Sequence, residues 1–196
     1  MKRILDFIIA LLCLVVFSPL FLIGYLIIRL EDGGPAFFSQ ERVGRDGRLF
    51  RIYKFRSMKT DVARDENALV GMERSDDLTR CGRFLRDHHL DELPQLWNVL
   101  KGDMSIVGPR PEVRRYVDLY TDEQRKVLTV RPGITDHASI RYINENEILC
   151  RADDPERVYI VQIMPDKIKL NMVYIEHHTL REYLRVILLT LKSLLS

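Results

Sequence analysis

Hydrophobic and polar positions are arranged differently along the chain, and each arrangement predicts a different element. Residues 7–28 hold no charged side chain over 22 positions, which is long enough for a membrane helix. Leu49–Phe55 alternates apolar and basic residues as a β-strand does, and Asp46–Gly47 before it favours the turn of a hairpin. Apolar positions at helical spacing predict helices over 79–86, 112–130 and 165–195, and Thr121–Gln124 is expected to open a second helix within 112–130. The pattern indicates an α+β fold that is mostly helical, with one small β-hairpin.

The long apolar stretch is interrupted at Ser18–Pro19. Proline removes one backbone hydrogen bond and presses on the preceding turn, so a kink is expected there. Two arms of about 11 residues, at ~1.5 Å per residue, are each too short to cross a bilayer. Basic residues lie on both sides of the stretch, with Lys2 and Arg3 before it and eight basic against four acidic residues in 29–59. A bent spanning helix and a re-entrant helix both remain open from the residues.

The adjacent carboxylates Asp91 and Glu92 precede a short apolar stretch, Leu93–Leu100. We expect one or two helical turns there, with Pro94 tolerated in the first turn. Negative charge is favourable at a helix N-terminus, so a charged first turn that caps a helix is one interpretation of the pair. A catalytic pair is the other interpretation.

A tight loop follows the carboxylates. Gly108 precedes Pro109, Arg110 and Pro111, so two prolines lock the backbone around one guanidinium. Arginine offers a planar fork of donors that suits phosphate oxygens. The loop is therefore either a phosphate clamp or a rigid surface turn.

Further cations fall at regular spacings near these motifs. Lys54 and Arg56 are two residues apart, so a strand would project them from one face. Arg83 and Arg86 share one face of the helix expected over 79–86. Contact with solvent or with lipid headgroups is the alternative to a binding role for these side chains.

Composition narrows the class of protein. The chain has 196 residues, a formal net charge of +2 and 46% hydrophobic residues, which fits one domain with a core and indicates no nucleic-acid partner. Its three cysteines are Cys13, Cys81 and Cys150. Their distant and odd-numbered positions predict neither a disulfide framework nor a zinc site, as expected on a reducing cytosolic side.

Several motifs together resemble one known family, the monotopic phosphoglycosyl transferases among the bacterial sugar transferases. The matching segments are Asp91–Ser105, Val107–Pro111, Lys54–Met58, Arg131–Thr135 and the amino-terminal apolar stretch. The resemblance implies a re-entrant helix broken at Ser18–Pro19 and a small member that consists of the catalytic unit. It divides the chain into a membrane helix at 1–30 and one catalytic unit at 31–196. Within that unit the last helix carries Arg185 and Lys192 and is too short between charges to span a membrane, so we expect an interfacial amphipathic helix or one that packs on the first segment. The protein would lie on the cytoplasmic face of the bacterial inner membrane.

The resemblance also implies a reaction. A sugar 1-phosphate would pass from a UDP-sugar to polyprenyl (undecaprenyl) phosphate, giving a polyprenyl diphosphate sugar and UMP. This is the first membrane step in assembling a polysaccharide, an O-antigen or a glycoprotein glycan. Asp91 would form a covalent aspartyl-phosphosugar intermediate, with Mg²⁺ held by Asp91 and Glu92. Glu92 would act as a metal ligand or as a proton acceptor.

The resemblance assigns the remaining site residues as well. Substrate phosphates would contact four cations: Lys54, Arg56, Arg86 and Arg110, with Pro109 and Pro111 shaping the nucleotide-side loop. We expect Arg131–Thr135 to form a rigid turn. Asp136–Ser139 after it departs from the usual family pattern, which leaves the donor sugar open.

Two other functions and the oligomeric state remain open. A magnesium-dependent lipid diphosphate phosphatase would also use acidic residues and arginines, but would release inorganic phosphate. A non-enzymatic membrane scaffold would use the carboxylates only as a helix cap. Membrane lipid is an expected partner, and both a monomer and a homodimer are compatible with the sequence.

Overall fold

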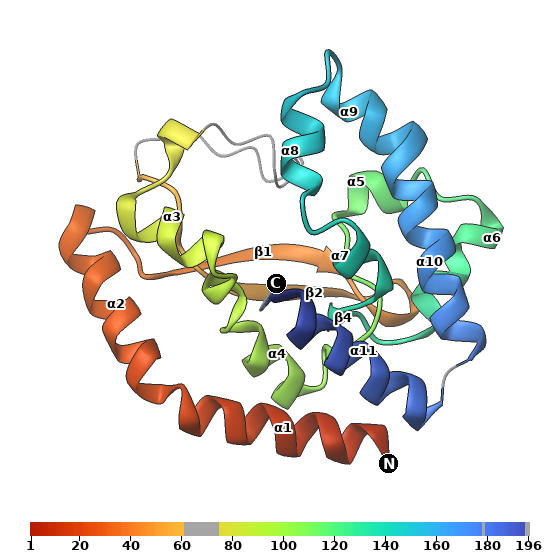
Figure 1. Cartoon of the computed structure of the whole chain (residues 1–196), viewed down its shortest axis with the longest axis horizontal. Coiled ribbons are helices and arrows are strands. Elements are labelled where there is room, and N and C mark those ends of the chain that lie inside the picture. Colours follow the sequence, from red (N-terminus) through yellow and green to blue (C-terminus); the bar gives the residue numbers. More distant parts are fainter. Residues whose placement is uncertain (61–74, 178, 195–196) are drawn as a thin grey trace. The chain divides into compact units, whose positions relative to one another are not determined.

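The computed structural model describes residues 1–60, 75–177 and 179–194, and these are mostly helical with two small two-stranded sheets (Figure 1). The predicted α+β class is therefore confirmed. The described chain divides into two compact units: residues 1–41, 51–60 and 75–102 form the first, and residues 42–50, 103–177 and 179–194 form the second. The amino-terminal helices and Asp91 lie in the same unit. The division at residue 30 stays a prediction.

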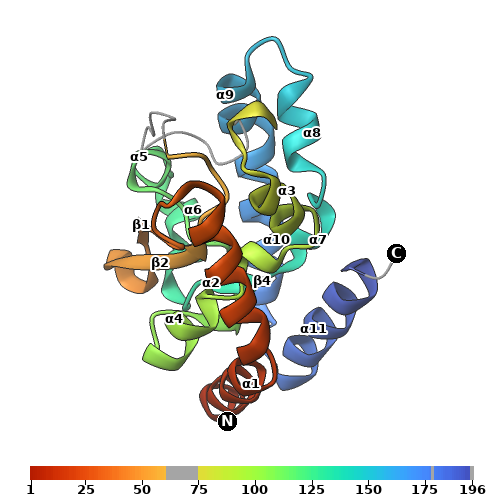
Figure 2. The same ribbon diagram turned by 90° about the vertical axis from the view of Figure 1, so that its left-hand side faces the viewer.

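Two helices that meet at an angle of 60° begin the first unit (Figures 1 and 2). A single residue, Phe17, separates helix α1 (Lys2–Val16) from α2 (Ser18–Asp32). The break therefore lies where the Ser18–Pro19 pair predicts it. Pro19 has no N–H to donate to the Val15 carbonyl, and the Ser18 hydroxyl donates to that oxygen at 2.8 Å. Among the described residues no single helix is long and apolar enough to cross a membrane, whereas α1 and α2 meet that requirement together.

The predicted hairpin is present. Strands β1 (Phe37–Val43) and β2 (Leu49–Phe55) form a two-stranded sheet. The 3₁₀ turn η1 (Arg45–Gly47) joins them, and both Asp46 and Gly47 adopt positive φ, at 56° and 76°. Asparagine, aspartate and glycine tolerate this conformation best, which explains why Asp-Gly marks the turn in the sequence.

The first unit also contains four short elements: η2 (Ser75–Asp77), α3 (Arg80–Asp87), η3 (Leu90–Glu92) and α4 (Gln95–Lys101). Its core contains Ile28, Ala36, Phe55 and Leu85, all buried. Helix α1 packs on α4, and the Arg3 guanidinium donates to the carbonyls of Val99 and Leu100. These carbonyls end α4, so a cation satisfies them where the helix dipole is negative.

A parallel strand pair that the sequence did not reveal lies in the second unit. Strand β3 (Ser105–Val107) pairs with β4 (Gly133–Thr135), with Ser105 opposite Gly133 and Val107 opposite Thr135. The expectation of a rigid turn at 131–135 was therefore wrong for its last three residues. Pairing requires close approach, because a Cβ at Gly133 would lie 2.1 Å from the Gly108 nitrogen. Three-residue strands are too short to show an alternating pattern.

Helices make up the rest of this unit. They are α5 (Arg114–Val117), α6 (Asp122–Arg125), η4 (Lys126–Thr129), α7 (His137–Arg141), α8 (Glu145–Cys150), α9 (Pro155–Val158), the π-helical turn η5 (Tyr159–Ile163), α10 (Met164–Glu176) and α11 (Leu180–Leu194). The second helix expected to open at Thr121 is confirmed, and a capping box formed by Thr121 and Gln124 starts it. The helix expected before it is short, because Val113 is extended and α5 begins at Arg114. Helix α11 is amphipathic as predicted: Tyr183 and Val186 are buried, while Arg185 and Lys192 are exposed.

Candidate active site

The acidic pair lies on the 3₁₀ turn η3, and the helix expected over Leu93–Leu100 is present as α4 but begins at Gln95, with Pro94 as its N-cap. His89 precedes it with a φ of 54°, a conformation that few residues other than glycine adopt. Asp91 is buried with 7% of its surface exposed, and Glu92 is partly buried. Burying ionisable side chains is costly unless charged or polar partners are close.

One such partner is Lys54, on strand β2. Its ammonium lies 2.8 Å from Oε1 of Glu92, and the side chains are only 12% and 16% exposed. An ion pair shielded from water in this way is stronger than one on the open surface. The structure therefore brings together two predicted site residues that are 38 positions apart in the sequence.

Asn98 is a residue that the sequence analysis missed. It lies in α4 with no exposed surface, and its side chain pairs with the edge of β2. Its Nδ2 donates to the Arg51 carbonyl at 2.7 Å, and its Oδ1 accepts from the Tyr53 N–H at 3.1 Å. Asn98 thus joins the helix that follows Glu92 to the strand that carries Lys54. One polar residue within the apolar stretch Leu96–Leu100 was the available signal.

Arg86 is positioned by the segment that follows β2. Its Nε donates to the Ser57 hydroxyl at 2.8 Å. Helix α3 can pack this closely because it carries Gly82, where a Cβ would lie 2.0 Å from the Ser57 carbonyl oxygen. Thr79 caps the helix by accepting from the Gly82 N–H at 2.8 Å, and its own N–H donates to that same Ser57 oxygen. Ser57, Gly82 and Thr79 were not predicted as supports of Arg86.

Arg56 is placed differently from Lys54, because β2 ends at Phe55 and the strand alternation stops there. Its guanidinium is 1% exposed, and protein oxygens accept from all five of its N–H groups. The acceptors are the Asp32 carboxylate, which takes two bonds, and the carbonyls of Ile28, Pro35 and Met58. The hydrogen bonds from Arg56 hold the pKa of Asp32 below its usual value. A phosphate contact by Arg56 stays a prediction, and this arrangement favours a structural role.

The acidic pair suits a hard cation. No group of three or more His, Cys, Asp or Glu side chains in the described ranges is arranged to hold a metal ion. Mg²⁺ does not need such a group, because it commonly binds one or two carboxylates together with substrate phosphates and water. The oxygens of Asp91 and Glu92 fit that donor chemistry, so magnesium binding remains a proposal that depends on bound substrate.

The Pro109–Arg110–Pro111 loop belongs to the second unit, where main-chain hydrogen bonds fix its course. Gly108 donates to the Thr135 carbonyl and Gly133 donates to the Pro109 carbonyl, both at 3.0 Å. The Arg110 N–H donates to Oδ2 of Asp136 at 2.7 Å. The predicted rigid loop is therefore present, and the end of β4 holds it from one side.

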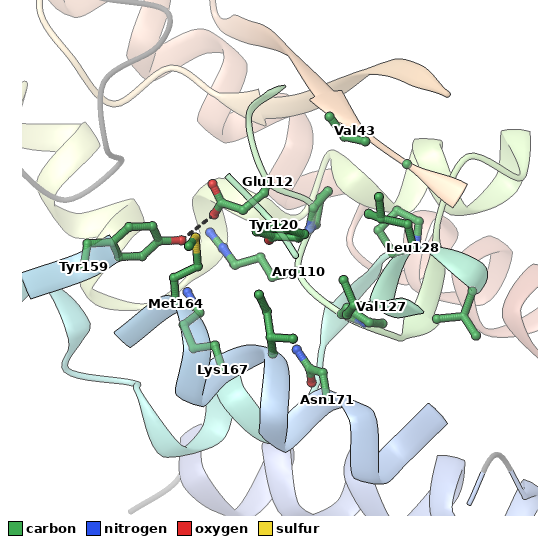
Figure 3. A pocket seen from close by; sticks show the side chains of 16 residues that line it. Val43, Arg110, Glu112, Tyr120, Val127, Leu128, Tyr159, Met164, Lys167 and Asn171 are labelled. Atoms are coloured by element: carbon green, nitrogen blue, oxygen red, sulfur yellow. Dashed lines mark hydrogen bonds between the residues drawn. The ribbon is translucent and has the colours of Figure 1, made fainter. Parts of the chain in front are cut away.

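A small cavity of about 40 Å³ lies beside this loop, with Arg110 and Lys167 pointing into it (Figure 3). Its polar wall includes Glu112, which accepts from the Tyr159 hydroxyl at 2.7 Å. Burial, with the charge of Glu112, raises the pKa of Tyr159 well above its usual value. Burial likewise raises the pKa of Tyr120.

Comparisons with known proteins agree with these motifs. The model of the bacterial sugar transferase family matches residues 1–196. The chain is 38% identical over 199 residues to a UDP-glucose:undecaprenyl-phosphate glucose-1-phosphate transferase of Caulobacter vibrioides, covering all of this chain and 70% of that protein. It is 39% identical over 175 residues to the galactosyl transferase CpsE of Streptococcus agalactiae, covering 84% of this chain and 36% of the relative.

A third relative is the undecaprenyl-phosphate galactose phosphotransferase of Salmonella typhimurium. It is 43% identical over 150 residues, which cover 69% of this chain and 31% of that protein. The chain therefore spans about a third of the length of two of these relatives and more than two thirds of the Caulobacter protein.

Proposed function

Because the chain belongs to the bacterial sugar transferase family, we propose that it transfers a sugar 1-phosphate from a UDP-sugar to undecaprenyl phosphate. The products are UMP and a polyprenyl diphosphate sugar. The family match over residues 1–196 and the names of the relatives support this reaction. The single observation that carries it is the buried carboxylate pair, in which Glu92 faces Lys54 while Asp91 precedes it on the same turn.

The first step in this proposal is nucleophilic. A carboxylate oxygen of Asp91 attacks the sugar-proximal phosphorus, and the bond from that phosphorus to the bridging oxygen breaks. UMP leaves with the bonding electron pair, and an acyl phosphate links the sugar phosphate to Asp91. An oxygen of undecaprenyl phosphate then attacks the same phosphorus and releases the carboxylate. Glu92 accepts a proton from the lipid phosphate where that group still carries one.

Cations stabilise the charge that develops on the transferring phosphoryl group. By their match to the family's motifs, we assign Lys54, Arg86 and Arg110 to phosphate oxygens of the substrates. Asp91 and Glu92 would hold Mg²⁺ together with those oxygens, and the ion would neutralise phosphate charge. We assign no phosphate contact to Arg56, because protein oxygens accept hydrogen bonds from all of its N–H groups.

The lipid acceptor requires contact with a membrane, and the first two helices offer the surface for it. Ile4, Leu12, Val15, Val16 and Leu22 are large apolar residues with more than half of their surface exposed. We propose that α1 and α2 enter one leaflet and return, since the bend lies near the middle of the pair and basic residues flank both ends. The protein would then act on the cytoplasmic face of the inner membrane, with the exposed side of α11 at the interface.

The test is UMP release from a panel of UDP-sugars in the presence of Mg²⁺ and undecaprenyl phosphate. We expect lipid-dependent UMP with one or a few donors, loss of turnover in Asp91→Asn, and loss on chelation of the metal. Asp87→Asn is the matched control, since Asp87 is an exposed carboxylate on α3 of the same unit. Release of inorganic phosphate from a lipid diphosphate without any nucleotide would indicate the phosphatase instead. Turnover of no substrate by folded protein would indicate the scaffold.

A further inference from the structure

Asp136 meets the Pro-Arg-Pro loop because of the parallel strand pair. Val107 lies opposite Thr135, so the residues that follow β3 and β4 emerge at the same edge of the sheet. Asp136 directly follows β4, and Arg110 comes three residues after β3. Two segments that are 26 positions apart thereby meet, and the Arg110 N–H donates to Asp136 at 2.7 Å.

This hydrogen bond has particular weight within the loop. Pro109 and Pro111 have no N–H, so the main chain of the tripeptide can donate only from Arg110. The prolines fix their own φ angles, and Pro111 also biases Arg110 toward an extended backbone. The Pro109–Arg110 peptide is then held at both of its polar atoms: Gly133 donates to its carbonyl at 3.0 Å, and the Asp136 carboxylate accepts from its N–H. Asp136 supplies the only one of these two bonds that comes from a side chain.

Asp136 is built into the protein as an acceptor. It is 1% exposed, and both of its oxygens are used. Oδ1 accepts from the Ser139 N–H at 2.5 Å, which caps α7, and Oδ2 accepts from Arg110 and from Nδ2 of Asn171 at 3.3 Å. A buried carboxylate with three donors is well satisfied, and such bonds to an ionised acceptor are stronger than neutral ones. Its side chain faces the protein and not solvent.

We propose that Asp136 is a positioning residue for Arg110, acting through the Arg110 main chain. The inference rests on the proposed function, in which the Arg110 side chain contacts a substrate phosphate. Asp136 fixes the direction in which that side chain leaves the loop, and a misplaced guanidinium stabilises the transferring phosphoryl group less well. Loss of Asp136 should therefore lower kcat more than it raises KM.

Two substitutions separate this role from capping. Asparagine and serine are both good N-caps, so Asp136→Asn and Asp136→Ser can still accept from Ser139. Each lacks the second acceptor oxygen that Arg110 uses. We expect kcat to fall about 10-fold in either variant, with KM for the UDP-sugar changed less than about 3-fold. The control is Asp154→Asn, which alters an exposed aspartate N-cap on α9 of the same unit and should keep wild-type kcat.

The decisive measurement is a double-mutant cycle with Arg110→Ala. Arg110→Ala alone should lower kcat about 100-fold, and adding Asp136→Asn should lower it less than about 2-fold further. If Asp136→Asn lowers kcat by the same factor in the wild-type and in the Arg110→Ala background, the inference is overturned and Asp136 only caps α7. Wild-type kcat in Arg110→Ala would overturn it too, because there would be nothing to position. Failure of the proposed function is separate: the wild-type chain would then release no UMP from any donor.

Discussion

The two units hold their phosphate-binding candidates in opposite ways. In the first unit Lys54 is oriented through its side chain, since its ammonium meets the Glu92 carboxylate at 2.8 Å. In the second unit Arg110 is oriented through its main chain, which donates to Asp136 at 2.7 Å. The first arrangement depends on the charge of the side chain. The second depends on the backbone, so it persists whichever side chain stands at position 110.

The difference extends to the surroundings of each site. Near Lys54 the polar groups are an ammonium and the Glu92 carboxylate, which form an ion pair. Near Arg110 the buried polar groups include the phenols of Tyr120 and Tyr159, and burial raises the pKa values of both, so they stay neutral further into alkali than exposed phenols do. Substitutions that remove a charge should therefore affect the first unit most. Substitutions that alter the backbone near Arg110, and a rise to alkaline pH, should affect the second unit.

Lys54→Met should produce the largest effect among the substitutions that distinguish the two units. It removes the cation beside Glu92 and leaves that carboxylate partly buried beside a thioether. We expect kcat to fall about 1000-fold, as when a charge-stabilising group is lost from an active site. UMP release at saturating donor measures this. Lys59→Met, at an exposed position on the same segment, should retain more than about half of the activity, and an equal loss in both variants would contradict the assignment.

Gly82→Ala should be the most damaging change to the packing of the first unit. The new methyl would lie 2.0 Å from the Ser57 carbonyl oxygen, so α3 must move away from the segment that follows β2. We expect a loss of about 3 kcal/mol in the free energy of unfolding. Thermal or denaturant unfolding in detergent measures it.

Gly24→Ala is the matched control for that change. The added methyl would lie 3.4 Å from the Phe55 ring, an ordinary contact, within a helix that alanine favours over glycine. It should leave stability unchanged or raise it by about 0.5 kcal/mol. A similar loss of stability in the two variants would mean that close contact at Ser57 is not what Gly82 provides.

Asn98→Ala tests whether the hydrogen bonds between α4 and β2 hold Lys54 beside Glu92. The substitution leaves the Arg51 carbonyl and the Tyr53 N–H of β2 without their side-chain partner, which should cost about 2 kcal/mol of stability. Turnover should fall as well, since α4 would dock less firmly on the strand that carries Lys54. Circular dichroism melting curves and UMP release measure the two effects. Asn144→Ala, at an exposed position without a side-chain capping bond, should change neither.

Tyr116→Phe should show the smallest effect, and only in alkali. Burial, followed by the charge of Glu156, raises the pKa of Tyr116 to about 12. The folded state therefore holds the phenolic proton more tightly than the unfolded state does. Stability from this group is complete below pH 10 and is lost as pH rises from 10 toward about 12. Melting temperatures at about pH 8 and pH 11 should fall further for wild type than for the variant, and parallel falls would contradict the shift.

Much of this architecture could be predicted from local signals. Asp-Gly marked the hairpin, Ser-Pro marked the break between α1 and α2, and Thr79 stands at the start of the helix that carries Arg86. The β3–β4 pair escaped prediction because each strand is three residues long and pairing is non-local. Arg56 was grouped with Lys54 on an alternation that ends one residue earlier, at Phe55.

The supports of the site were harder to predict than the charged residues themselves. Asn98, Ser57 and Asp136 act through specific hydrogen bonds with segments distant in sequence, and neither residue type nor spacing indicates such partners. Arg110 and Lys54 stand out in the sequence because charge flanked by proline or apolar residues is conspicuous. The group that accepts from the Arg110 N–H could be identified only from the folded structure.

The bond from Arg3 to the end of α4 bears on how the protein can be handled. Arg3 belongs to the amino-terminal helix, yet its acceptors are the carbonyls of Val99 and Leu100, eight and nine residues beyond Asp91 in the chain. Removing that helix to obtain a water-soluble fragment would also uncap the short helix that follows the acidic pair. Detergents that strip or distort the amino-terminal segment should for the same reason inactivate the enzyme before they unfold it. In the re-entrant arrangement proposed above, lipid nanodiscs would keep that segment in a bilayer and would be the better setting for kinetic work.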